Sequence, residues 1–144
     1  MDRNKITQYY SNETEKKRFE IDFFMLEGIR TKEIVSRYLF KDKMSIIDIG
    51  GGAGYYSFWL QEKGHNMNLV DLSPKNIELA KRQTLDTGMQ LANCEIGDAT
   101  NLNFKDETFD LALLFGPLYH LTDKAERLKA LSEAKRVQNQ TEFF

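Results

Sequence analysis

The sequence predicts an α/β domain in which helices cover both faces of a parallel sheet. Short apolar runs rich in β-branched residues alternate with helical segments from residue 44 onward, and this alternation is typical of right-handed βαβ units. A glycine-rich turn joins the first run to the helix that follows it. The chain has 144 residues, of which 41% are hydrophobic, and this is enough for one packed core.

The N-terminal part is expected to be helical over residues 1–43, because apolar residues recur there at spacings of three and four. Gly28 is expected to separate two helices in this segment. The expected strands cover residues 44–49, 67–72, 91–96 and 109–115. Residues 97–108 are expected to be more loop than helix. We therefore predict an N-terminal helical cover over residues 1–43 and a sheet domain over residues 44–144.

The helices of the sheet domain have recognisable start and stop signals. The first is expected over residues 55–63. The second begins with Ser73, a natural N-cap, and Pro74, which suits the first helical position, and Gly88 ends it. The third begins near residues 122–123. Its expected buried side chains are Leu128, Leu131 and Val137.

The composition excludes several classes of partner. A formal net charge of -2 gives no electrostatic signature of a nucleic acid or an anionic membrane as partner. No apolar run approaches the roughly 20 residues that span a bilayer. Cys94 is the single cysteine, so no intrachain disulfide is possible and a cytoplasmic location is expected. Cys94 is expected to be buried and His65 to lie on the surface, and too few such residues stand together to suggest a metal site.

The glycine-rich turn lies in the stretch IIDIGGGAGYYS, residues 46–57. Its alternate positions hold Gly50, Gly52 and Gly54. The dinucleotide fingerprint G-x-G-x-x-G would instead need a glycine where Tyr55 stands. Asp48, in the preceding strand, would repel a pyrophosphate but could accept hydrogen bonds from an ammonium group or from the loop amides. The pattern therefore favours an amino-acid tail over a pyrophosphate, and a purely structural role for Asp48 fits equally well.

Two further aspartates follow the second and third expected strands. Asp71 ends the second strand, where a carboxylate accepts hydrogen bonds from ribose hydroxyls. Asp98 follows the third strand, where a carboxylate can accept a hydrogen bond from an adenine amino group. Together with the glycine turn, they predict a nucleoside ligand that carries an amino acid. The alternative for Asp71 is a helix cap, and for Asp98 a turn residue.

These motifs resemble those of the class I S-adenosylmethionine-dependent methyltransferases. IIDIGGGAGYYS is similar to the first motif of that family, NLVDLSPKNIELA to its second-strand motif, EIGDATNLNF to its third motif and FDLALLFGPLYHL to its fourth-strand motif. The four motifs stand in the usual order, and GPLYHL resembles a bacterial subgroup that acts on small molecules. The resemblance implies a Rossmann-like sheet with strand order 3-2-1-4 and S-adenosyl-L-methionine as the cofactor.

The resemblance also implies a set of site residues. The candidate cofactor-binding residues are Asp48, Gly50, Gly51, Gly52, Gly54, Asp71, Leu72, Asp98, Ala99 and Phe115. Tyr119 and His120 are candidates for the acceptor side. No catalytic residue is assigned, because methyl transfer from a sulfonium needs orientation and exclusion of water above all. Tyr9 or Tyr10 is a candidate to close over the cofactor, and Arg18 to reach its carboxylate.

We therefore expect a methyltransferase that acts on a small-molecule acceptor. The alternative is a non-catalytic module that binds S-adenosylmethionine or S-adenosylhomocysteine, whereas the glycine spacing disfavours a nicotinamide-dependent oxidoreductase. Members of the family usually continue with further strands where this chain reads QNQTEFF, so we expect a C-terminally truncated domain. The edge of the fourth strand, residues 111–114, is then expected to be unprotected and to pair with a second copy, giving a homo-oligomer such as a dimer.

Overall fold

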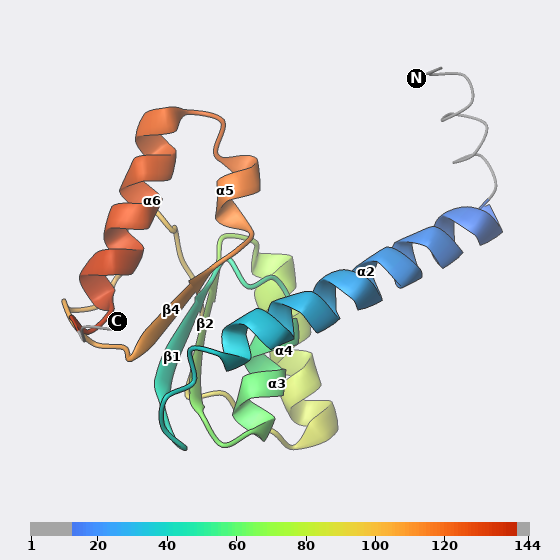
Figure 1. Ribbon diagram of the computed structural model, residues 1–144, viewed down its shortest axis with the longest axis horizontal. Helices are drawn as coiled ribbons and strands as arrows, with labels where there is room; N and C mark the ends of the chain where they lie inside the picture. Colours follow the sequence, from blue (N-terminus) through green and yellow to red (C-terminus); the bar gives the residue numbers. More distant parts are fainter. Residues whose placement is uncertain (1–12, 141–144) are drawn as a thin grey trace. The chain divides into compact units, whose positions relative to one another are not determined.

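The computed structural model describes the backbone of residues 13–140 and the side chains of residues 21–118 and 120–140. In this part of the chain, one parallel sheet contains β1 (Ser45–Ile49), β2 (Asn66–Asp71), β3 (Asn93–Ile96) and β4 (Leu111–Leu114) in the order β3-β2-β1-β4 (Figure 1). The helices around it are α3 (Tyr55–Glu62), α4 (Pro74–Thr87), α5 (Pro117–His120) and α6 (Lys124–Val137). The predicted fold class and strand order are confirmed.

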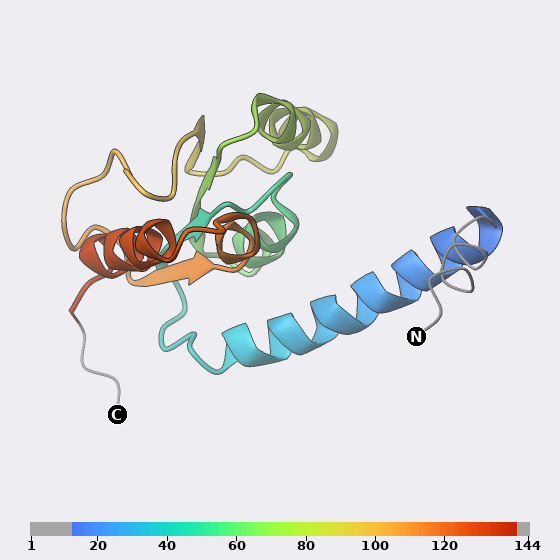
Figure 2. The same ribbon diagram turned by 90° about the horizontal axis from the view of Figure 1, so that it is seen from above.

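The side chains of β1 alternate between the two faces of the sheet, as the two-residue period of a strand requires. One buried cluster consists of Ile47, Ile49, Val70, Leu102, Phe109 and Val137. Because Val137 ends α6, this cluster lies on the α6 face. Asp48 points to the other face, where its Oδ2 accepts a hydrogen bond from Ser57 Oγ of α3 at 2.8 Å. Figure 2 shows the same layers, with α6 on one side of the sheet and α3 and α4 on the other.

The ends of α4 are where the sequence predicts them. Ser73 is the N-cap, and its Oγ accepts a hydrogen bond from the Asn76 N–H at 3.3 Å, while Pro74 is the first residue of the helix. Gly88 closes the helix with a φ of 72°, a value that glycine adopts at little cost. The other predicted strands and helices of the sheet unit are present, and residues 97–108 form the predicted loop.

The N-terminal helix differs from the prediction. α2 (Glu13–Ser36) runs through Gly28 as one continuous helix, so the expected break at Gly28 is wrong. A glycine inside a helix costs about 1 kcal/mol relative to alanine, which weakens a helix without ending it. By its contacts the chain divides into two compact units, one ending at Phe40 and the other beginning at Lys41. The cover role of residues 1–43 stays a prediction, and Tyr9, Tyr10 and the side chain of Arg18 lie outside the described residues.

Two predictions about burial are wrong and one holds only in part. In α6, Leu128 and Leu131 are 55% and 47% exposed, because the helix meets the sheet unit through the smaller Ala130 and through Val137. His65 is buried, with 4% of its surface exposed. Its Nδ1 accepts a hydrogen bond from the Met44 N–H at 3.1 Å, which ties the turn before β2 to the start of β1. Cys94 is half-buried, where we expected full burial.

β4 is an edge strand, and residues after α6 cover the start of that edge. The Asn139 N–H donates to Phe109 O at 2.7 Å, and Gln138 forms a parallel bridge with Phe109. Farther along, the side-chain Oε1 of Gln138 accepts a hydrogen bond from the Ala112 N–H at 3.1 Å. These contacts occupy part of the edge that the sequence predicted to be unprotected. Within residues 13–140, no helix combines the length and apolarity needed to cross a membrane.

Candidate functional site

The glycine loop between β1 and α3 is shaped by tight contacts as well as by backbone conformation. Gly50, Gly52 and Gly54 have φ values of 67°, 62° and 92°, a region that residues with a Cβ rarely adopt. A Cβ on Gly50 would lie 2.4 Å from Cγ of Pro117, the first residue of α5. A Cβ on Gly51 would lie 2.4 Å from Asp48 Oδ2. The loop is therefore packed between α5 and the buried Asp48.

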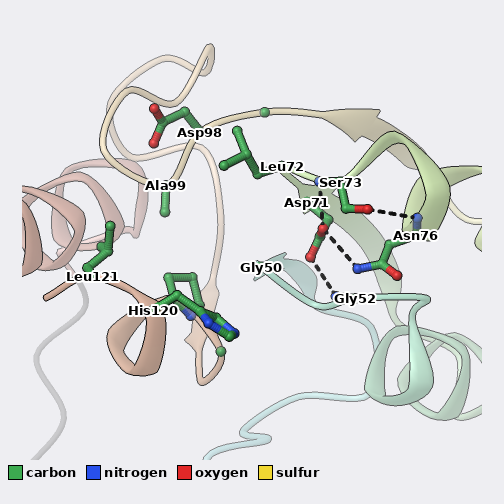
Figure 3. Close-up of a pocket in the computed structure, with 13 residues that line it drawn as sticks. Gly50, Gly52, Asp71, Leu72, Ser73, Asn76, Asp98, Ala99, His120 and Leu121 are labelled. Atoms are coloured by element: carbon green, nitrogen blue, oxygen red, sulfur yellow. Dashed lines mark hydrogen bonds between the residues drawn. The ribbon is translucent and has the colours of Figure 1, made fainter.

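Asp71 at the end of β2 faces this loop and is held by three N–H donors. Its Oδ2 accepts a hydrogen bond from the Gly52 N–H at 2.9 Å. Its Oδ1 accepts bonds from the Ser73 N–H at 2.9 Å and from Asn76 Nδ2 at 3.2 Å, both at the start of α4 (Figure 3). Only 9% of Asp71 is exposed. The carboxylate is thus fixed in one orientation, and a carboxylate oxygen that accepts one bond can accept a second from a ligand.

Asp98 lies in the loop after β3, at the rim of a cavity that the glycine loop and Asp71 also line. Its Oδ1 accepts hydrogen bonds from Thr100 N–H at 2.9 Å and from Thr100 Oγ1 at 2.8 Å. The Thr100 N–H, followed by the Thr100 hydroxyl, lowers the pKa of Asp98, so this carboxyl group is ionised at neutral pH. Figure 3 shows Ala99 directed into the cavity below it. The preceding Gly97 has no room for a side chain, because a Cβ there would lie 2.6 Å from Val70 Cγ1.

The glycine loop with Asp71 and the loop that carries Asp98 form two walls of the cavity. The third wall comes from α5 and the segment after it. Gly116, Pro117, His120 and Leu121 line the cavity there. Figure 3 shows the imidazole of His120 directed towards the glycine loop. Arg127 of α6 fixes this wall, since its Nη1 donates to Leu121 O at 2.9 Å and to Thr122 O at 2.8 Å.

These three walls enclose a cavity of about 520 Å³ that brings together residues from all four predicted motifs. The predicted site residues that line it are Gly50, Gly52, Asp71, Leu72, Asp98, Ala99 and His120. Predicted residues that do not line it are Asp48, Gly51, Gly54 and Phe115. The side chain of Tyr119 lies outside the described residues. Phe115 instead contacts Tyr56 edge to face, with ring centroids 5.7 Å apart.

Asp48 is buried beneath the glycine loop, with 1% of its surface exposed. Burial raises the pKa of Asp48 from 3.8 to about 6, the Ser57 hydroxyl opposes this rise, and the nearby charge of Asp71 adds to it. The side chain fixes the start of α3 through Ser57, which agrees with the structural role that the sequence left open. Among the described residues, no group of three or more His, Cys, Asp or Glu side chains is placed to hold a metal ion.

Sequence reasoning missed several residues that line the cavity. They are Ser73, Asn76, Gly97, Gly116, Pro117 and Leu121. A signal existed for Asn76, because a side chain in the first turn of a helix that starts beside Asp71 can reach back to that carboxylate. No comparable signal existed for Pro117 and Leu121, since the sequence did not predict the short helix α5.

Comparisons with known proteins agree with this geometry. A family model described as "Methyltransferase domain" matches residues 46–141. The chain is 28% identical over 113 residues to 2-methyl-6-phytyl-1,4-hydroquinone methyltransferase 2 (chloroplastic) of Oryza sativa subsp. japonica, a match that covers 77% of this chain and 31% of that protein. It is 30% identical over 93 residues to a ubiquinone/menaquinone biosynthesis C-methyltransferase of Zymomonas mobilis, covering 64% of this chain and 37% of that protein.

A solved structure is also similar. It is described as a SAM-dependent methyltransferase from Methanosarcina mazei, with 28% sequence identity and a TM-score of 0.67. The match covers 74% of this chain and 52% of that one. The chain spans about a third of the length of the two curated relatives and about half of the solved structure.

Proposed function

Because the chain belongs to the methyltransferase domain family, we propose that its sheet unit binds S-adenosyl-L-methionine and transfers the methyl group to a small-molecule acceptor. One observation carries the proposal. The Asp71 carboxylate is fixed against the glycine loop by the Gly52 N–H at 2.9 Å, and both residues line the cavity, so the loop and the acid at the ends of β1 and β2 form one binding surface. Asp98 adds a second carboxylate on the wall that the loop after β3 forms in the same cavity.

The residues present fit the three parts of this cofactor. Asp71 would accept the hydrogen bonds of the ribose hydroxyls, since its orientation is already set. Asp98, Ala99 and Leu72 would surround the adenine, because all three line the cavity beside Asp71. The methionine end would lie over the glycine loop, where a Cβ on Gly52 meets no atom within 4 Å and the space is open to a ligand.

The remaining candidates have less direct roles in this proposal. Asp48, Gly51 and Gly54 would shape the loop from below, and Phe115 would lie beside the methionine end without lining the cavity. S-adenosylmethionine supplies an activated methyl group on a sulfonium, which the acceptor attacks in line. The protein orients the two reactants and excludes water. His120 would lie on the acceptor side, where an imidazole can take up a proton from the acceptor.

The acceptor class is proposed from the relatives as well as from the site. Of the two curated relatives described above, one is named as a hydroquinone methyltransferase and the other as a C-methyltransferase of ubiquinone/menaquinone biosynthesis, and hydroquinones carry an aromatic ring. We therefore place reduced quinones first in an acceptor screen.

Homo-oligomer formation along the part of the β4 edge beyond Ala112 is a separate proposal, which light scattering of the purified chain tests: a monomer at high concentration contradicts it. The cytoplasmic location stays a prediction, tested by cell fractionation.

The decisive experiment is a calorimetric titration of the 144-residue chain with S-adenosylhomocysteine. Asp71→Asn keeps the shape of the side chain but removes its charge, and we expect it to weaken binding by about tenfold or more, as is usual for hydrogen bonds to a charged group. Asp86→Asn, on the exposed side of α4, is the matched control and should bind like the wild type. Absence of binding by the wild type at millimolar ligand would refute the proposal.

A second assay separates catalysis from binding alone. Transfer of a labelled methyl group from S-adenosylmethionine to a panel of quinols and other small molecules would establish the enzyme. Tight binding of both cofactor forms without transfer to any acceptor would instead favour the non-catalytic module.

A further inference from the structure

One guanidinium on α6 holds the loop that carries Asp98. Arg136 Nη1 donates to Phe104 O at 2.7 Å and to Asp106 Oδ1 at 2.8 Å. Its Nη2 donates to Leu102 O at 3.0 Å. Two further bonds join Nε and Nη2 to the carboxylate of Glu133, at 2.8 and 2.9 Å. These contacts use all five N–H groups that an arginine has.

Glu133 completes the contact from the other side. Its Oε2 accepts a hydrogen bond from the Leu102 N–H at 2.8 Å, so the pair holds both the N–H and the C=O of one loop residue. The side chains of Arg136 and Glu133 are only 30% and 17% exposed. The hydrogen bonds from Arg136 lower the pKa of Glu133, which keeps it ionised at neutral pH. The backbone O of Arg136 also accepts a bond from the Glu107 N–H at 2.9 Å.

The held segment is continuous with the adenine-side wall of the cavity. Residues 97–108 contain no helix or strand that would fix their position, and Figure 2 shows this loop passing beside α6. Asn101, next to Leu102, donates its N–H to Asp98 O at 3.0 Å. The side chain of Leu102 is 5% exposed and belongs to the core cluster. A shift of Leu102 would therefore move the turn that presents Asp98 and Ala99.

We propose that Arg136, together with Glu133, is a positioning residue for recognition of the adenine base. The pair fixes the loop before the ligand arrives, so that the carboxylate of Asp98 meets the adenine amino group without a cost for ordering the loop. Lysine cannot replace arginine in this role, because its three N–H groups diverge from one atom and cannot serve two backbone carbonyls and two carboxylates. This inference rests on the proposed function, since it assumes that the cavity binds an adenosyl group.

The competing explanation is that the pair stabilises the fold and has no effect on the ligand. A matched control is available on α4, where Arg82 and Glu78 form an ion pair at 3.4 Å with side chains that are 64% and 71% exposed. Neither residue lines the cavity. Exposed pairs of this kind contribute little to stability.

The test compares two ligands on the full chain, S-adenosylhomocysteine and its inosine analogue, in which oxygen replaces the adenine amino group. The wild type should prefer the adenine compound by about tenfold or more, the usual loss when a hydrogen-bonded group is left without its partner. Arg136→Lys and Glu133→Gln should reduce this preference to less than about threefold, because a mobile loop no longer presents Asp98. Arg82→Lys and Glu78→Gln should keep the wild-type preference.

The ratio of the two dissociation constants separates positioning from stability. If Arg136→Lys and Glu133→Gln lower the melting temperature but keep the preference for adenine, the pair is structural and the proposal is refuted. If Arg136→Lys does not fold, the isosteric Glu133→Gln decides by the same criterion. A wild type that binds both compounds equally overturns the positioning role while the proposed function stands, whereas a wild type that binds neither overturns both.

Discussion

Replacement of Asp48 by asparagine should stabilise the protein at alkaline pH. Asp48 is buried beneath the glycine loop, and burial, with the charge of Asp71, raises its pKa from 3.8 to about 6. Each pKa unit corresponds to about 1.36 kcal/mol, so this rise amounts to about 3 kcal/mol. The folded state therefore binds more protons than the unfolded state between these two values. Protonation of Asp48 therefore stabilises the folded state; this contribution is complete below the unfolded pKa and is lost as the pH rises through about 6.

Asparagine has the same shape and no charge, and its side chain can still bond to Ser57. The difference in unfolding free energy between Asp48→Asn and the wild type should therefore shift in favour of the variant by about 2 kcal/mol between pH 4 and pH 8, because Asp48 of the unfolded state is already partly ionised at pH 4. Urea unfolding followed by the fluorescence of the single tryptophan, Trp59, measures this difference at each pH. Asp86→Asn, on the exposed side of α4, is the control and should show no such shift. A difference that stays constant with pH would refute the reasoning.

Two further predictions follow from the same geometry. Burial, followed by the charge of Lys63, lowers the pKa of His65, so the unfolded state takes up the proton first and the wild type should lose stability as the pH falls through about 6.5. His65→Asn, whose Oδ1 can replace Nδ1 as acceptor, should remove this part of the dependence of unfolding free energy on pH. An unchanged pH dependence in urea unfolding would contradict this. Gly52→Ala and Gly88→Ala should each cost about 1–2 kcal/mol, because both glycines have positive φ and open space around a Cβ. Only Gly52→Ala should also weaken binding of S-adenosylhomocysteine, since Gly52 lines the cavity, and equal affinity of the two variants in calorimetry would show that the glycine loop does not contact the ligand.

The sequence was sufficient to predict those parts of the site that lie at the ends of parallel strands. Asp71 and Asp98 each follow a short apolar run directly, and the carboxyl ends of parallel strands meet at one edge of the sheet, so their proximity follows from the order of the strands. Gly50 and Gly52 could be placed for the same reason. Position beside the glycine loop did not determine which residues face the cavity, because Asp48 lies in β1 and its side chain is directed towards Ser57 of α3.

Predictions based on periodicity were less accurate where packing depends on small residues. Leu128 and Leu131 occur at the helical spacing that usually indicates a buried face, but α6 approaches the sheet unit through Ala130 and Val137. His65 shows a related difficulty, because a histidine after a helix-ending glycine is usually exposed. It is buried and its Nδ1 accepts a hydrogen bond from the Met44 N–H, a long-range contact that no local pattern indicates.

The walls of the cavity explain why the site was only partly predictable. Leu121, which lines the cavity, and Leu102, which lies in the loop that leads to Asp98, are far apart in the sequence. Both are held by arginines of α6, because their backbone carbonyls accept hydrogen bonds from Arg127 and Arg136. A backbone carbonyl carries no signature in the amino-acid sequence, so the contact becomes visible only once the helix is placed beside the loop. The strand ends thus supply the groups that would touch the ligand, while a helix without a recognisable motif determines whether those groups are held in place. Replacement of Arg136 on α6 should therefore change the selectivity of the site, although Arg136 itself does not line the cavity.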